Sequence, residues 1–128
     1  MSAVRSLIIT SALGTAAVCL GPLVAEAASD SPAAALSVTH ITCVTQEDIN
    51  GADDAYLVAG GNTIWGPTQM TKGDSKDITG VTFNAGDVLT LMEGDWPDAD
   101  DNLGAIKIDK AGVYHYTDDG ADYWVTVS

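Results

Sequence analysis

Short segments of alternating apolar and polar residues, separated by turn residues, fill the chain from residue 36 onward. Alternation with a period of two predicts half-buried β-strands, and β-branched and aromatic residues are frequent in these segments. No helical period extends beyond a turn or two. The sequence therefore predicts an all-β fold, a single antiparallel β-sandwich of about eight short strands over residues 36–128. Gly66 and Pro67 are expected to end one strand. The expected strand segments are 36–45, 55–59, 63–65, 77–79, 81–83, 88–92, 103–108, 113–116 and 123–127.

The N-terminal segment has the features of a secretory signal peptide. One early positive charge precedes an apolar run over residues 7–24, and the small-residue sequence Ala25-Glu26-Ala27 provides a cleavage site. A membrane anchor, or a lipid attached at Cys19, fits less well, because glycine and proline interrupt the run and a bulky residue precedes the cysteine. We expect residues 1–27 to be a signal peptide, residues 28–35 to be a disordered lead-in, and the protein to be secreted to the extracellular space.

Acidic residues dominate the charge of the chain. There are 18 acidic and 5 basic residues, and the formal net charge of −13 is unchanged when Arg5 and Glu26 leave with the signal peptide. A surface of this charge repels phosphate backbones, so nucleic acid is excluded as a partner, and membrane binding is not expected. The same surface attracts cations.

Four conspicuous residues outside the acidic segments are expected to be structural. Cys43 is alone once the signal peptide is removed, and we expect a buried apolar residue there rather than an intermolecular bridge or a reactive thiol. Trp65 and Trp124 lie in expected strands and are predicted to be core residues. His40 is expected to be an ordinary strand residue. A small secreted fold without a disulfide often uses a structural metal for stability.

Two expected loops are rich in carboxylates. Residues 46–54 form one of them, and residues 93–104 place five acidic side chains within nine positions. Carboxylates this close repel one another unless they face water or share a cation, and oxygen-rich clusters suit a hard ion such as calcium. Glu93 and Asp95 are two residues apart at a strand end, so they point the same way and can converge on one ion.

The spacings in both loops resemble the calcium-binding loops of C-two domains, the calcium- and lipid-binding β-sandwiches of the protein kinase C and synaptotagmin type. The first loop reads Asp-x-x-Gly-x-x-Asp-x-Tyr, and the second reads acid-x-Asp-x-x-x-x-x-Asp-x-aliphatic-Gly. The resemblance covers residues 36–128 and implies an eight-stranded sandwich with both loops at one end, around one or two calcium ions. It implies five side-chain ligands, which are Asp48, Asp54, Glu93, Asp95 and Asp101.

Neighbouring groups provide additional candidate ligands. The same match makes the Trp96 carbonyl a candidate backbone ligand. Asp53, Asp98 and Asp100 lie beside the implied ligands, where their charge would raise affinity for the ion or support the residues that contact it. The Trp96 side chain is expected at the tip of its loop, free to insert into a lipid or a partner.

These features favour a secreted, non-enzymatic, calcium-binding β-sandwich module whose acidic loops are ordered by the ion. The alternative is a secreted acidic protein-interaction or inhibitor domain with no metal site, whose acids face water or a basic partner. An enzyme is not expected, because no His, Ser or Cys has a recognisable catalytic setting. An EF-hand fits poorly, since Leu103 occupies the position that requires glycine.

Overall fold

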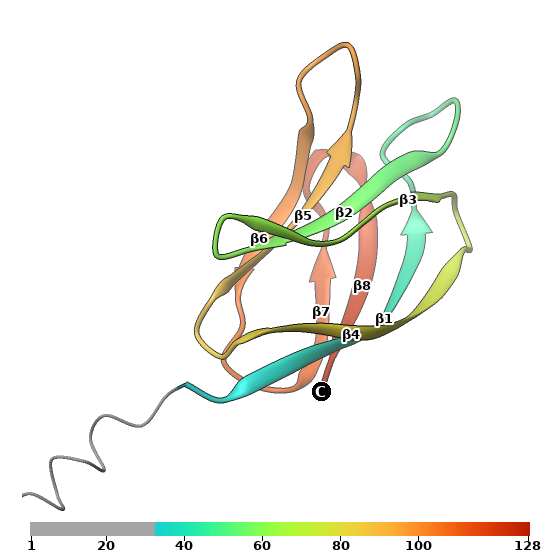
Figure 1. The fold of residues 1–128 in the computed structure, drawn as a ribbon. Coiled ribbons are helices and arrows are strands. Elements are labelled where there is room, and N and C mark those ends of the chain that lie inside the picture. The colour runs from blue at the N-terminus through green and yellow to red at the C-terminus, as the bar shows by residue number, and fades with distance from the viewer. Residues whose placement is uncertain (1–32) are drawn as a thin grey trace, which may run out of the picture. The chain divides into compact units, whose positions relative to one another are not determined.

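Eight β-strands account for most of residues 33–128, the part of the chain that the computed structural model describes (Figure 1). The all-β prediction is confirmed. The predicted signal peptide and residues 28–32 of the predicted lead-in lie outside the described residues. Within residues 33–128 no helix has the length and apolar character needed to cross a membrane. The elements are β1 (Ala35–Thr45), β2 (Asp53–Ala59), β3 (Asn62–Met70), β4 (Ser75–Asn84), β5 (Val88–Gly94), β6 (Asp101–Lys107), β7 (Gly112–Tyr116), the 3-10 turn η2 (Asp118–Gly120) and β8 (Asp122–Val127).

The strands form two antiparallel four-stranded sheets, with the orders β4-β1-β8-β7 and β3-β2-β5-β6. β7 and β1 are both antiparallel to β8, so they run in the same direction. β2 follows β1 in the chain and is antiparallel to β5. The β1–β2, β5–β6 and β7–β8 connections therefore lie at one end of the sandwich, and Figure 1 shows the first two projecting there.

The core lies between the sheets, where alternate side chains of both sheets meet. In β2, for example, Ala55, Leu57 and Ala59 are buried, and the residues between them are partly exposed. The Tyr116 hydroxyl in β7 donates to the Leu89 carbonyl in β5 at 2.9 Å and so joins the two sheets. The buried apolar residues are Val38, Ile41, Cys43, Ala55, Leu57, Ala59, Met70, Ile78, Phe83, Leu89, Leu91, Leu103, Ile108, Tyr116, Ala121, Tyr123, Val125 and Val127.

Two strands, β3 and β4, are much longer than the sequence predicts. The bounds of the other strands lie within two residues of the expected ones, which places Asp53, Glu93 and Asp101 in strand ends rather than in loops. Gly66 and Pro67, expected to end a strand, lie inside β3. β3 is an edge strand, and proline is tolerated there because no neighbour on its open side needs an N–H donor. The segments 77–79 and 81–83 form a single strand, β4, which passes through Gly80 at a φ of 72°. β4 is also an edge strand, so it pairs on one side only.

Trp124 is not a core residue, and the prediction that it packs inside is wrong. Its side chain is 43% exposed, and its ring stacks on His115 of β7 with the ring centroids 4.7 Å apart. The buried positions of β8 are Tyr123, Val125 and Val127, so Trp124 falls on the opposite face. The cross-strand aromatic pair covers the outer surface of this sheet.

Cys43 and Trp65 lie where the sequence predicts. Cys43 in β1 is fully buried between the sheets. Trp65 in β3 is partly buried and packs against the core cluster. Burial raises the pKa of the Cys43 thiol, which keeps it in the neutral, unreactive form.

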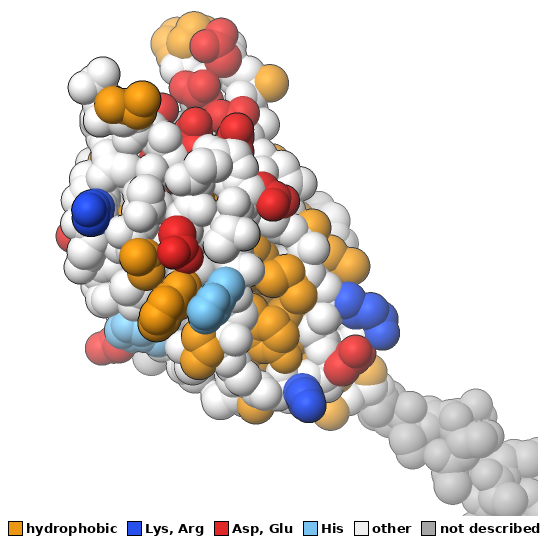
Figure 2. All heavy atoms as spheres, turned by 180° about the vertical axis from the view of Figure 1, so that it is seen from behind, with side chains coloured by type: hydrophobic (Ala, Val, Ile, Leu, Met, Phe, Trp, Pro, Cys, Tyr) orange, Lys and Arg blue, Asp and Glu red, His pale blue; other side chains and the backbone are white. Residues whose placement is uncertain are grey.

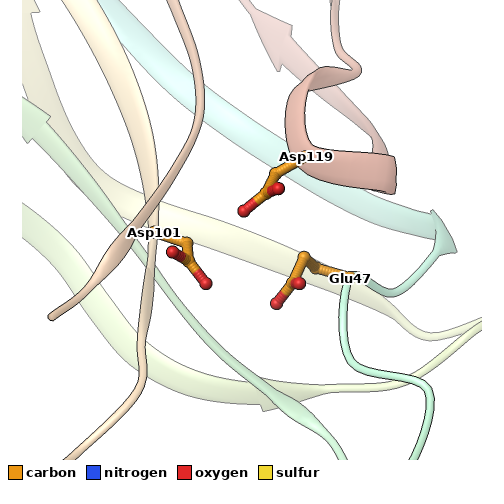
Figure 3. Close-up of side chains that lie close together, drawn as sticks. All are labelled: Glu47, Asp101 and Asp119. Atoms are coloured by element: carbon orange, nitrogen blue, oxygen red, sulfur yellow. The ribbon is translucent and has the colours of Figure 1, made fainter. Parts of the chain in front are cut away.

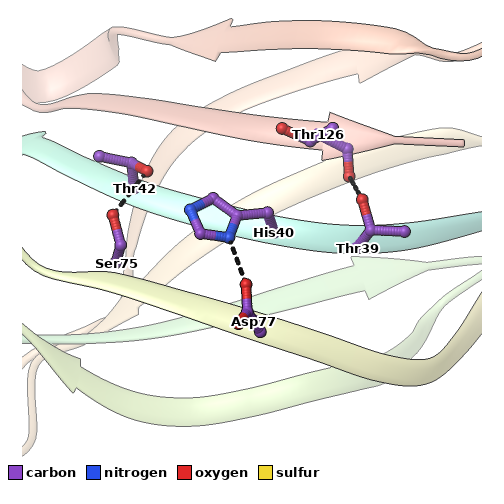
Figure 4. A network of polar contacts seen from close by, with 6 residues as sticks. All are labelled: Thr39, His40, Thr42, Ser75, Asp77 and Thr126. Carbon is purple, nitrogen blue, oxygen red and sulfur yellow. Dashed lines mark hydrogen bonds and ion pairs between the residues drawn. The ribbon is translucent and has the colours of Figure 1, made fainter.

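His40 takes part in a polar network on the outer surface of β1 and β4 (Figure 4). Its Nδ1 lies 2.8 Å from Oδ1 of Asp77, which is its cross-strand neighbour. Two residue pairs further along, on the same face, the hydroxyls of Thr42 and Ser75 are 2.9 Å apart. His40 is thus a strand residue whose contacts tie β1 to the edge strand β4.

Candidate metal centre

Six carboxylates meet at one end of the sandwich, from three connections and from the adjoining ends of β5 and β6. They form three groups of three, and within each group one oxygen per residue lies within 4.8 Å of the others. Each group shares members with the other two, so the six side chains make one connected set, called the acidic cluster below. Figure 3 shows the side chains of one group pointing toward one another. The groups are Glu47, Asp101 and Asp119; Glu47, Asp48 and Glu93; and Glu93, Asp95 and Asp101.

Asp53, at the start of β2, holds the β1–β2 loop in place. Its Oδ2 accepts the Glu47 N–H at 2.8 Å, and its Oδ1 accepts the Asp48 N–H at 3.0 Å. The Tyr123 hydroxyl of β8 also donates to Oδ2, at 2.6 Å. The main chain that carries two cluster residues is thereby fixed to both sheets.

Glu93 is the most deeply buried member of the acidic cluster. It continues the inward alternation of Leu89 and Leu91 along β5, so its side chain enters the sandwich and is only 1% exposed. Oε1 accepts the Asp54 N–H at 3.1 Å. Oε2 is buried and has no hydrogen-bond partner. Burial, with a smaller effect from nearby negative charges, raises the pKa of Glu93 to about 7.

The electrostatic environment of the acidic cluster is unfavourable without a cation. The pKa values of Glu47, Asp48 and Asp101 are raised, first by burial and then by repulsion from neighbouring carboxylates. Both ion pairs found within residues 33–128 lie outside the cluster. No lysine therefore neutralises these charges in the described part of the chain, and a bound cation would relieve the repulsion.

The structure brings together most of the ligands implied by the loop spacings. Asp54 is not in the acidic cluster, because its side chain alternates with the inward-pointing Asp53. Its N–H donates to Oε1 of Glu93. Asp53, an additional candidate, uses both its oxygens on other donors. The implied ligands that do belong to the cluster are Asp48, Glu93, Asp95 and Asp101.

The remaining candidates of the β5–β6 loop lie outside the acidic cluster. Asp100 accepts hydrogen bonds from the Tyr56 hydroxyl and, at 3.3 Å, from the Asp95 N–H. It therefore shapes the loop around a cluster residue. Asp98 and the Trp96 side chain are exposed at the loop tip.

Two cluster residues, Glu47 and Asp119, were not predicted from the sequence. Glu47 directly precedes Asp48 in the first acidic loop. Asp119 belongs to η2 in the β7–β8 connection and has a left-handed φ of 57°. The acids of segment 117–122 provided a signal, because alternating strand directions place this connection at the same end as the two acidic loops.

Two large apolar side chains stand at the tips of the loops that supply the cluster. Ile49 is 94% exposed and Trp96 is 92% exposed. Figure 2 shows acidic side chains gathered at one end of the molecule, with hydrophobic side chains among them at its extremity. Within residues 33–128 no pocket is found. Five of the six cluster residues are at least partly exposed, and Glu93 alone is buried.

No protein-family model, curated protein or solved structure matches this chain. The resemblance of the loops to those of C-two domains therefore stays a prediction. What the centre binds has to follow from the chemistry of its own carboxylates.

Proposed function

We propose that this protein is a secreted, non-enzymatic β-sandwich module that binds calcium through the acidic cluster. One observation carries the proposal, the buried Oε2 of Glu93 without a hydrogen-bond partner. Exposed acids are common without an ion, but a buried carboxylate oxygen with no partner is costly in a folded protein. A cation among the cluster residues would supply that partner.

The chemistry of the cluster supports calcium in particular. All six side chains offer oxygen, which is the ligand type of hard cations, and none offers the nitrogen or sulfur that favours zinc. Calcium accepts six to eight oxygen ligands in irregular geometry, whereas magnesium requires near-ideal octahedral geometry. A site assembled from three separate connections fits calcium better. The C-two-like spacings of the two loops point to the same ion.

The proposed role of the ion is to order the three connections. Without it, six neighbouring carboxylates repel one another; with it, the connections form a more rigid and more nearly neutral surface. Extracellular modules typically bind calcium with dissociation constants of about 10⁻⁴ to 10⁻³ M. Calcium in excess of these values would stabilise the folded protein, because the ion binds the folded state and not the unfolded one.

Calcium titration by calorimetry, with one ligand variant and one control, tests the proposal. Asp101→Asn is the informative variant, because Asp101 belongs to two of the three groups. Asp109→Asn makes the same chemical change on an exposed acid that pairs with Lys107 between β6 and β7, outside the cluster. We expect Asp101→Asn to weaken calcium binding at least about tenfold, a loss of about 1.4 kcal/mol. Equal affinities for wild type and Asp101→Asn would exclude this residue as a ligand.

The exposed loop tips support a second candidate function, an acidic protein-interaction domain without a metal site. Ile49 and Trp96 are large apolar residues that are almost fully exposed on the loops that supply the cluster, and aromatic residues such as tryptophan are enriched at protein interfaces. In an acidic interaction domain without a metal, partner binding would weaken with added salt and ignore a chelator. In the calcium-binding module, a chelator would remove the ion that orders the loops, so it would change the surface that a partner contacts.

A further inference from the structure

Asp53 is a buried carboxylate that lies directly beneath the acidic cluster. It is 0% exposed, and it continues the inward alternation of Ala55 and Leu57 along β2. A buried charge is stable only when donors surround it. Asp53 has three, the main-chain N–H groups of Glu47 and Asp48 and the hydroxyl of Tyr123.

The donors of Asp53 come from two different parts of the fold. The two N–H groups belong to the β1–β2 loop, at the residues whose side chains enter the cluster. The hydroxyl comes from Tyr123, a fully buried residue of β8 in the other sheet. Through this one carboxylate, the position of the loop is set by the rigid interior of the sandwich.

We propose that Asp53, anchored by the Tyr123 hydroxyl, is a positioning residue that presents the Glu47 and Asp48 carboxylates to the bound cation. The proposal rests on the calcium-binding function proposed above, and adds to it residues that set affinity without touching the ion. Glu47 belongs to two groups of the cluster, and Asp48 shares one of them with Glu93. Loss of the Asp53 anchor would therefore disturb both groups that include the loop.

The hydrogen bonds of Asp53 indicate that it positions other ligands and does not contact the ion itself. Both oxygens already accept hydrogen bonds directed from the loop and from β8. Neighbouring acids of the cluster have no such set of donors, and Oε2 of Glu93 has none. Residues that orient metal ligands through hydrogen bonds typically change metal affinity by about 10- to 100-fold when mutated.

The test compares calcium affinity and metal-free stability in Asp53→Asn, Tyr123→Phe and the control Asp109→Asn. Asn keeps the size of Asp53 but replaces one acceptor oxygen with an NH₂ group, which cannot accept a main-chain N–H. Phe keeps the bulk of Tyr123 and removes one of the three donors. We expect Asp53→Asn to weaken calcium binding by about 10-fold or more, Tyr123→Phe to weaken it by about 3-fold or more, and the control to stay within about 2-fold. The number of ions bound should not change.

The outcomes separate this inference from the function on which it rests. If wild type binds no calcium, the proposed function fails. If wild type binds calcium and both variants bind it with wild-type affinity, the positioning role is wrong, even if their melting temperatures in chelator are lower. If Asp53→Asn does not fold, Tyr123→Phe decides the question. Amide hydrogen exchange adds a readout that needs no calcium, because we expect the Glu47 and Asp48 amides to lose protection in Asp53→Asn.

Discussion

At the scale of single residues, Glu93 connects the fold with the proposed function. Its inward direction was predictable, because it continues the alternation of Leu89 and Leu91 in β5. The loop spacing also identified it as a candidate ligand. The partnerless Oε2 was not predictable, because it depends on how residues distant in sequence pack around the side chain. Asp53 shows the same limit, since its partner Tyr123 is 70 positions away.

The raised pKa of Glu93 predicts how pH affects the metal-free protein. Its pKa is about 7 in the folded state and 4.5 ordinarily. A carboxyl with a raised folded-state pKa contributes stability below its unfolded pKa, and this contribution is lost as pH rises through the folded pKa. In metal-depleted buffer we expect the free energy of unfolding to fall between pH 4.5 and 7. The loss attributable to Glu93 should be on the order of 3 kcal/mol, at about 1.4 kcal/mol per pKa unit.

Urea unfolding at a series of pH values measures this dependence, with Glu93→Gln as the comparison. Glutamine is close in size and does not ionise, so the variant should show a clearly flatter profile. The pKa values of Glu47, Asp48 and Asp101 are also raised, which lowers stability as pH rises. The free energy of unfolding of Glu93→Gln should therefore still fall with pH, but less steeply than that of the wild type. A wild-type profile that rises with pH over this interval, or a variant with the wild-type slope, would contradict the assignment.

At the scale of elements, the sequence predicted the strands well where two neighbours bury one face. β2 and β5 pair on both sides, and their alternation is clear. The largest errors in strand extent fall on β3 and β4, which are edge strands. Glycine and proline normally signal turns, but an edge strand tolerates them, because it pairs on one side only. Local sequence does not reveal which strands are at the edge.

Gly66 in β3 is a position where only glycine fits. Its φ is 84°, and a Cβ atom there would lie 2.5 Å from the Ala55 carbonyl oxygen. Gly61 has a similar φ of 80°, but a Cβ would meet nothing within 4 Å. We expect Gly66→Ala to lower the free energy of unfolding by at least about 2 kcal/mol, and Gly61→Ala by about 1 kcal/mol, since the second change carries only the conformational cost.

Chemical denaturation of the two glycine variants checks this difference. The matched φ values mean that the excess loss in Gly66→Ala reports the close approach of β3 to β2. Equal losses in the two variants would show that the backbone relaxes around the added methyl group, and would contradict the tight packing at Gly66.

At the scale of the whole molecule, the acidic cluster is a product of topology. The two acidic loops were recognisable in the sequence, but their contact with the β7–β8 connection depends on the sheet order. That order brings Asp119 beside Glu47 and Asp101, which lie far from it in the chain. Alternation along β2 places Asp54 on the face opposite Asp53. The sequence therefore located two of the three acidic connections and four of the six cluster residues, and the fold determines which carboxylates lie together.

The most direct test of the proposed calcium site is the thermal unfolding of residues 28–128, the chain that would remain after removal of the predicted signal peptide, which contains the whole described fold. It is measured in excess EDTA, in calcium and in magnesium, with each ion at about 10 mM. At dissociation constants of about 10⁻⁴ to 10⁻³ M, mass action gives calcium roughly 1.4–2.7 kcal/mol of stabilisation. For a domain of this size, that predicts a rise in melting temperature of about 5 °C or more, with a clearly smaller rise in magnesium. Equal melting temperatures in EDTA and in calcium would contradict the calcium site.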